Sequence, residues 1–269
     1  MANTKLNILP VPTFASLGVN YTERDISEYE IKDVTVSDDD NKEIVQYIIS
    51  DTITNITVDT NVSSKLIQIF DGSSQTASRL NVTLADNARL DLVQLYLGGD
   101  LVSEIVTELK GGRSAFTADI AYDLGAGEGL DLNLVANHYG RKSSSEISVN
   151  GVLREDAKKT FKGTIDFKNG AAGSVGSEKE EVILMSEKAV NKTVPVILCD
   201  EEDVMGNHGA TIGRIDERHI FYMKSRGIPE EKIYELMARS KLMKAIRLID
   251  DKQTKIKIYE TLGWGDENE

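Results

Sequence analysis

The chain has 269 residues, of which 28% are charged and 40% hydrophobic, a composition typical of a globular protein with a full core. Acidic residues outnumber basic ones by 44 to 31, which gives a net charge of −13 and argues against binding to nucleic acids or to anionic membranes. No apolar run is long enough to span a bilayer, the start lacks a secretory signal, and the single Cys199 excludes an intrachain disulfide, so we expect a cytoplasmic protein.

The first fifty residues have no clear periodicity, and we treat them as a separate N-terminal segment, residues 1–50. Its triplet Asp38-Asp39-Asp40 is interpreted as a solvated loop, because no calcium-binding spacing surrounds it. From there to about residue 175, apolar and polar residues alternate, which indicates strands buried on one face. The predicted strands cover residues 53–58, 66–70, 80–84, 90–97, 116–124, 130–136, 147–149 and 161–167.

Two features break this pattern. The alternation slips within residues 90–97, which we interpret as a β-bulge, and a short helix is predicted near residues 101–109. Because no longer helical pattern separates the strands, a sheet with helical crossovers is unexpected. The periodicity leaves three all-β architectures open: a sandwich, a barrel or a solenoid.

The period changes after residue 215. Asp216 is a suitable N-cap for a helix over residues 217–226, which Gly227 can end. Pro229 then begins a helix that extends to about residue 249, and a last helix is predicted over residues 252–262. The acidic tail 265–269 is expected to fray.

The motifs of common enzymes are absent: there is no Walker loop, no GxSxG and no HExxH. Among the histidines, His138 is interpreted as an anchor for the loop after a strand, and His219 as a solvated or capping residue of a helix. His208 lies between Asn207 and Gly209, where an imidazole is free to reach a metal ion or act as a base.

Other candidate ligands are few. Glu178, Glu180 and Glu181 offer carboxylates, although such a run, GSEKEE, is typical of a solvated stretch. Cys199 follows an apolar strand and is interpreted as a buried, inert thiol. The residues alone therefore favour a binding or assembly protein over an enzyme.

Residues 138–242 resemble the SufB/SufD family of iron–sulfur cluster assembly subunits. The resemblance is carried by Glu202-Asp203-Val204, His208-Gly209-Ala210-Thr211, Gly213-Arg214-Ile215-Asp216, Ile220-Phe221-Tyr222-Met223 and Ser225-Arg226-Gly227-Ile228. Upstream, His138, Ser144, Gly151-Val152-Leu153, Phe161, Gly163, Leu184-Met185-Ser186, Ala189 and Pro195 fit the same pattern.

This resemblance implies a mainly β fold, with a right-handed parallel β-helix core over residues 51–215 and a helical region over residues 216–269. The helical region is expected to dock on a SufC-like ABC ATPase through Asp216, Phe221, Tyr222, Ser225, Arg226 and Gly227. The core is expected to pair with a SufB-like subunit or with itself. His208 matches the family histidine implicated in cluster assembly, and Glu178 and Glu180 are weaker candidates for binding a transient iron–sulfur cluster or its metal.

The chain also departs from the family pattern. It has no cysteine shortly before Ser186, and Asn207 and Gly209 stand where B-type subunits carry acidic residues. It is therefore similar to a short D-type member, and a thiolate-rich cluster site would have to be shared with a partner. The main hypothesis is a non-enzymatic scaffold that binds no nucleotide itself. The alternatives are an interaction subunit without cluster chemistry and an enzyme with a His/Glu site.

Overall fold

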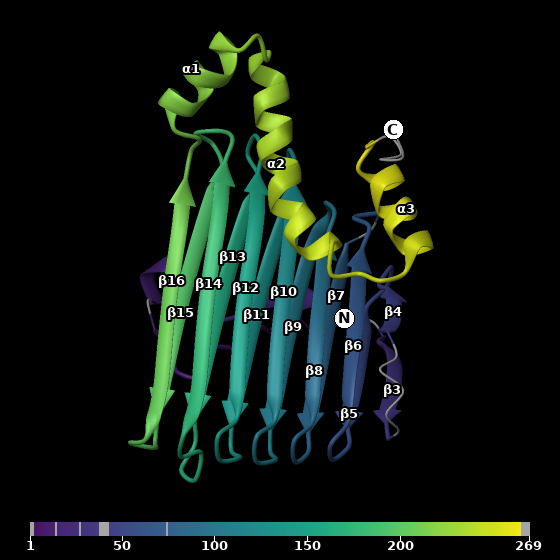
Figure 1. The fold of residues 1–269 in the computed structure, drawn as a ribbon, viewed down its shortest axis with the longest axis vertical. Helices are drawn as coiled ribbons and strands as arrows, with labels where there is room; N and C mark the ends of the chain where they lie inside the picture. Colours follow the sequence, from purple (N-terminus) through teal and green to yellow (C-terminus); the bar gives the residue numbers. More distant parts are fainter. Residues whose placement is uncertain (1–2, 14, 27, 38–42, 74, 265–269) are drawn as a thin grey trace.

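The computed structural model describes residues 3–13, 15–26, 28–37, 43–73 and 75–264. The acidic triplet Asp38-Asp39-Asp40 and the tail 265–269 lie outside this range. Two parallel sheets of seven strands each make up the core (Figure 1). The even sheet contains β4 (Glu43–Tyr47), β6 (Ser63–Phe70), β8 (Arg89–Tyr96), β10 (Ala115–Leu124), β12 (Ser144–Leu153), β14 (Ser174–Leu184) and β16 (Val204–Gly213). The odd sheet contains β3 (Glu30–Val36), β5 (Thr52–Val58), β7 (Thr76–Leu84), β9 (Asp100–Leu109), β11 (Gly129–His138), β13 (Lys158–Phe167) and β15 (Val190–Cys199).

Consecutive strands alternate between the two sheets, so the chain winds as a parallel β-solenoid and each strand pairs with the strands one coil before and after it. The expected parallel β-helix with C-terminal helices is confirmed, and sandwich and barrel are excluded. The coils differ in length, since Ser63 lies beside Arg89 whereas Ser174 lies beside Val204. This variation explains why no sharp repeat is visible in the sequence.

Inward-facing side chains of both sheets form the main core. Leu66, Leu92, Leu132, Ile165 and other apolar residues meet there, all essentially inaccessible to solvent. At the N-terminal end the core also contains a ladder of amides, in which Gln94 donates to Gln68 and Gln68 donates to Gln46. Stacked amides of this kind satisfy one another from coil to coil, so polar residues can occupy the interior without loss.

The helix predicted near residues 101–109 is wrong. This segment is β9, whose register runs without interruption along β7 and β11. Its inward positions carry Leu101, Ser103, Ile105 and Leu109, a period of two that Val102 and Val106 on the outer face obscure. Pairing with distant strands therefore decides the secondary structure of a segment whose local sequence pattern is ambiguous.

The bulge predicted within residues 90–97 is also wrong. β8 pairs with β6 and β10 in continuous register, and the alternation fails because both faces of the strand are buried. Val93 and Leu95 point outward, where they join an apolar cluster with α2 (Glu230–Ile246) and α3 (Lys252–Thr261). A strand covered on both faces has a continuous apolar sequence.

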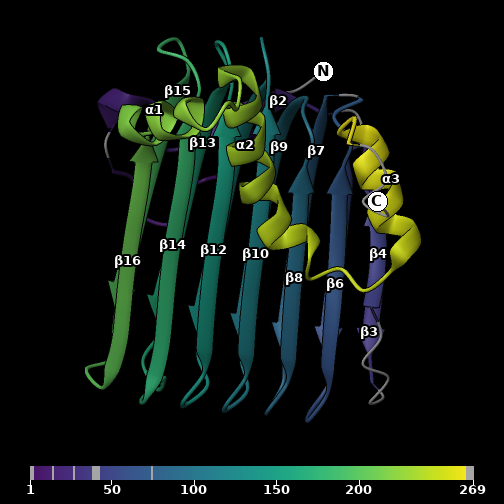
Figure 2. The same cartoon turned by 45° about the horizontal axis from the view of Figure 1, so that its top comes forward.

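The C-terminal helices match the prediction closely. The side chain of Asp216 caps α1 (Glu217–Ser225) by accepting from the amide of Arg218, and Gly227 follows the helix with a positive φ of 84°. α2 crosses the outer face of the even sheet, and α3 lies further along the same face (Figure 2). Ala238, Leu242, Ala245, Ile246 and Ile258 bury their side chains there. No helix among the described residues is long and apolar enough to cross a membrane.

The residues before the solenoid cover part of the odd sheet. β1 (Asn3–Leu6) and β2 (Thr22–Asp25) pair as an antiparallel hairpin. Asp131 on β11 holds this hairpin by accepting hydrogen bonds from Asn7 and Thr22. Lys162, which is fully buried, donates to the carbonyl of Asn7 and pairs with Asp131 at 2.9 Å.

Candidate functional site

The last coil of the solenoid is covered on one side only. β15 and β16 each pair with the preceding coil, and among the described residues no strand pairs with their outer edges. Positions that would be interior in an earlier coil are therefore open to solvent here, and His208 is one of them. Exposed apolar side chains at this end include Val190, Ile197, Met205 and Ile212.

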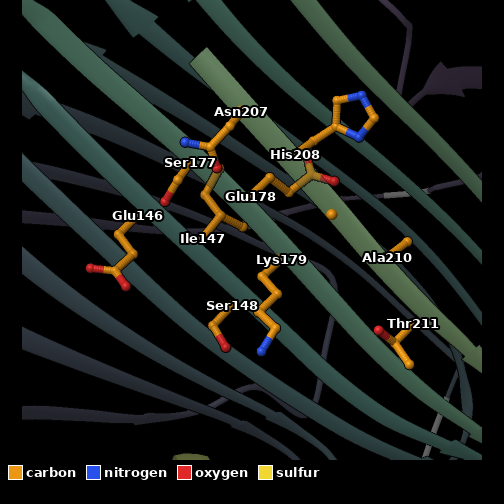
Figure 3. Close-up of a pocket in the computed structure, with 11 residues that line it drawn as sticks. Glu146, Ile147, Ser148, Ser177, Glu178, Lys179, Asn207, His208, Ala210 and Thr211 are labelled. Carbon is orange, nitrogen blue, oxygen red and sulfur yellow. The ribbon is translucent and has the colours of Figure 1, made fainter. Parts of the chain in front are cut away.

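His208 ends an inward-facing row that runs the length of the even sheet. The row consists of Ile44, Leu66, Leu92, Ala118, Ile147, Glu178 and His208, each the register partner of the next. Register partners on parallel strands project to the same face, so the imidazole extends toward the open end of the interior beside Glu178. Figure 3 shows His208 and Glu178 pointing together, away from Glu146 and Lys179.

Glu178 and Glu180 are interior residues, exposed to 4% and 0%. Their interpretation as part of a solvated stretch is wrong, because alternation along β14 sends them inward while Lys179 and Glu181 point outward. Glu180 forms an ion pair with Lys159 of β13, and both side chains are fully buried. Thr193 of β15 donates to Glu180 at 2.7 Å and accepts from the Lys159 ammonium at 3.3 Å.

Electrostatics set Glu178 apart from an ordinary carboxylate. Burial, together with the nearby charge of Glu180, raises the pKa of Glu178 to about 7, and Lys159 opposes this rise only in part. The carboxylate has room because Gly163 lies opposite, where any β-carbon would overlap its oxygens. A carboxyl group that exchanges its proton near neutral pH beside a histidine can take up a metal ion and release a proton.

The outer surface of the same strands forms a separate shallow pocket. It is lined by Glu146, Ser148, Lys179 and Thr211, and it lies over Gly209, where no side chain fills the space (Figure 3). Glu178 and His208 also line this pocket, but alternation along β14 and β16 directs their side chains to the opposite face from Lys179 and Thr211 (Figure 3).

Cys199 is exposed, so its interpretation as a buried thiol is wrong. It ends β15 in the row of Leu109, His138 and Phe167, and only the absence of a following coil leaves it open. Its thiol donates to the carbonyl of Glu201 at 3.2 Å. Within the described part of the chain, no three His, Cys, Asp or Glu side chains are gathered as a complete metal site would need.

The other two histidines are structural or solvated. His138 is fully buried, and its two ring nitrogens contact the hydroxyls of Ser143 and Ser145, each at 2.8 Å. This agrees with the predicted role as a loop anchor. His219 is exposed on α1, as expected for a solvated residue.

The predicted docking residues gather on and around α1, a helix without a single buried residue. Phe221 and Tyr222 are exposed to 75% and 56%, and the guanidinium of Arg226 lies over the ring of Tyr222 at 5.3 Å. Figure 1 shows α1 standing beyond the strand ends of the solenoid. Large exposed apolar side chains of this kind are common on surfaces that bind other proteins.

Two groups of charges fix α2 to the solenoid. Glu181 accepts hydrogen bonds from Lys241 and Lys244 at 2.6 and 2.8 Å, and the lysines around it hold the pKa of this carboxyl well below its usual range. Arg154, which follows β12, joins Asp123 to Glu235 of α2 at 2.7 Å each. The helix that follows α1 is therefore bound to β14, whose opposite face carries Glu178 and Glu180.

Comparison with known proteins agrees with this geometry. The model of the SufBD core domain, described as SUF system FeS cluster assembly, matches residues 30–241. The chain belongs to the SufBD core family. The resemblance noted in the sequence is thereby confirmed, and the match begins at the first strand of the solenoid, β3.

The individual relatives include SufD and SufB proteins. The iron-sulfur cluster assembly protein SufD of Bacillus subtilis strain 168 is 31% identical over 225 residues, which cover 81% of this chain and 48% of SufD. SufB of the same organism is 26% identical over 154 residues, covering 56% of this chain and 33% of SufB. A SufBD family protein of Mycobacterium leprae is 29% identical over 115 residues, 43% of this chain and 13% of that protein. The chain thus spans about half the length of SufD and less of the others.

Sequence reasoning missed Lys159 and Thr193. Lys159 lies where the alternation of β13 predicts an apolar inward residue, before Phe161, Gly163 and Ile165. A lysine in an inward position is itself a signal, because a buried ammonium requires a carboxylate partner. That partner, Glu180, occupies an inward position of β14, the strand that follows β13 in the chain and belongs to the even sheet.

Proposed function

We propose that this chain is a non-enzymatic scaffold subunit of a SUF-type complex that assembles iron–sulfur clusters. Membership of the SufBD core family and the similarity to SufD support this role. The proposed residues are His208 as a ligand of the cluster or its iron, with Glu178 and Glu180 beside it. The cluster is the cargo of the complex, held transiently rather than as a resident cofactor.

The single observation that carries the proposal is the position of His208. It ends an interior row beside Glu178, whose carboxyl pKa is raised, at the C-terminal end of the solenoid, where His208 is exposed to solvent. A soft metal centre needs more ligands than these two residues supply. We therefore propose that a second subunit, SufB-like or a second copy of this chain, closes this end and completes the site.

The unpaired edges of β15 and β16 support that partner. Exposed strand edges pair readily with another chain, and Val190, Ile197, Met205 and Ile212 add apolar area at the same end. The second proposed partner is a SufC-like ABC ATPase that covers Phe221 and Tyr222 on α1. Localisation in the cytoplasm follows from this assignment as a proposal.

Pull-down with a SufC-like ATPase and a SufB-like subunit tests the assembly. Wild-type chain is expected to retain both at micromolar concentration. Phe221→Asp is expected to lose the ATPase while keeping the second subunit, because the Phe221 side chain is 75% exposed and its loss should leave the fold intact. Binding of neither protein by the wild type would refute the proposal. Phe221→Ser, which removes the ring without adding a charge, separates loss of the apolar contact from the effect of the new charge.

His208→Ala tests the chemistry in the assembled complex. The variant is expected to form the complex and to lose cluster assembly, measured by the visible absorption of the reconstituted cluster. A second candidate function, an interaction subunit without cluster chemistry, is favoured by the lack of three gathered ligands in the described residues. Full assembly by His208→Ala would establish that second function instead.

A further inference from the structure

The side chain of Lys159 places a buried ammonium group in the interior of the last coils. Lys159 is not exposed at all, it pairs with Glu180, and the charge of Glu178 also acts on it. Thr193 and the ring of Phe161, 5.5 Å from the nitrogen, complete its surroundings. A buried pair of this kind is costly to form and adds little net stability, so its presence calls for another explanation.

Two buried polar atoms in this region lack a partner. The ring of Tyr122 crosses Gly151, which leaves it room, and its hydroxyl is fully buried without a hydrogen bond, within reach of the charge of Glu180. Beside Lys159 in the sheet, Asn191 likewise has a side-chain oxygen without a partner. A tyrosine hydroxyl and an amide oxygen without partners, in the same region as two carboxylates, are further oxygen atoms that a cation could bind.

We propose that Lys159 is a tethered cation that occupies the interior carboxylate site and competes there with a divalent metal ion. The proposal rests on the proposed function, in that it concerns the carboxylates beside His208. Glu178 and Glu180 are two residues apart on one face of β14, and the ammonium contacts Glu180 where a metal ion would bind it. A metal ion gains those oxygens only when the ammonium leaves them, so Lys159 keeps affinity low and binding reversible.

The strand offers a matched control. Lys162 is three residues away, is also fully buried and also pairs with a carboxylate, Asp131. Its side chain lies on the outer face of the odd sheet under the N-terminal hairpin. The sheet itself therefore lies between Lys162 and the inward-facing carboxylates of β14. Replacing either lysine removes one buried positive charge, but only Lys159 faces the proposed site.

The test measures Mn²⁺ binding to the isolated full chain at about pH 8 by the loss of the free-ion electron paramagnetic resonance signal. Lys159→Gln is expected to bind Mn²⁺ at least about tenfold more tightly than wild type, because it removes one repelling charge and keeps a hydrogen-bond donor to Glu180. Lys162→Gln is expected to match wild type. Lys159→Gln combined with Glu180→Gln is expected to lose the gain.

Equal affinity of Lys159→Gln and wild type, with both folded by circular dichroism, would overturn the proposal, as would an equal gain in Lys162→Gln. A second readout needs no variant: in wild-type protein labelled with ¹⁵N-lysine, saturating Zn²⁺ should shift the Lys159 side-chain resonance and leave that of Lys162 in place. Unmoved resonances under saturating Zn²⁺ would also contradict it. The proposed function fails separately, through the pull-down, because metal binding is measured without partners.

Discussion

Glu178 makes folding stability depend on pH in an unusual direction. Its pKa rises from 4.5 to about 7 on folding, so the folded state prefers the protonated form, and the stability this group contributes is lost as pH rises through that range. Glu178→Gln fixes the neutral form. We expect it to match wild type near pH 4 and to exceed it by roughly 3 kcal/mol near pH 8.

Urea unfolding at the two pH values measures this difference. Glu181→Gln, the neighbour that points outward, is the control, and it should lose stability instead because its carboxylate is held by lysines. A constant difference between Glu178→Gln and wild type at both pH values would contradict the expected linkage.

His138 makes folding stability depend on pH in the opposite direction to Glu178, over nearly the same pH range. Burial lowers the pKa of its imidazole from 6.5 to about 4, so the folded state requires the neutral ring. The stability it contributes is present above about pH 6.5 and is lost as pH falls toward 4. We expect wild type to lose roughly 3 kcal/mol more than His138→Gln between pH 7 and pH 4, measured by chemical unfolding. Parallel losses in the two proteins would show that the ring is not held neutral.

At the scale of the elements, one close contact fixes the path of β12. Gly151 lies under the ring of Tyr122, and a β-carbon there would overlap the ring atoms. Gly151→Ala is expected to destabilise the fold by about 3 kcal/mol through overpacking. In a double-mutant cycle, Tyr122→Leu should recover a large part of that cost, because the smaller side chain leaves space for the methyl group.

Gly209→Ala is the control for the cost of alanine in a strand glycine, since a β-carbon at that position meets nothing within 4 Å. It should leave the unfolding midpoint nearly unchanged. Strict additivity of Gly151→Ala and Tyr122→Leu would show that the ring does not cause the glycine requirement.

The helices and strands of this fold are predictable from the sequence where one face of the element is exposed to solvent. Alternation located β10, β11 and β13, and capping by Asp216 located α1, because each depends on a local pattern. β8 was misread because α2 and α3 cover its second face, and β9 because Val102 and Val106 place apolar residues on its outer face. Which solenoid coil a strand joins depends on contacts between distant residues, and no local pattern carries that information.

The candidate site was only partly predictable for the same reason. His208 stood out through its small neighbours and its family motif, whereas the inward direction of Glu178 and Glu180 depends on the phase of β14. Gly163 and Lys159 on β13 accommodate that phase, because the glycine leaves room for Glu178 and the lysine pairs with Glu180, and the sequence does not mark these residues as neighbours. Burial, and with it the pKa of Glu178, follows from this phase.

At the scale of the whole molecule, each coil of the solenoid contacts only the coils beside it, so stability should vary along its length. β16 has one neighbour, β14, whereas β10 has two. Terminal repeats of such arrays open first. We expect amides of β16 to exchange hydrogen much faster than those of β10 in the isolated chain, and to become protected when a second subunit is added, as measured by mass spectrometry. Uniform protection along the even sheet would contradict this gradient.

The N-terminal hairpin has a consequence for the order of synthesis. Asn7 and Thr22 leave the ribosome early, yet the side chain that holds them, Asp131, follows more than a hundred residues later, and Lys192 reaches the carbonyl of Leu17 later still. This segment is thus synthesised well before the residues that hold it in place. During translation the coils must stack before this segment closes over the odd sheet, so it reports on whether most of the solenoid has already been built.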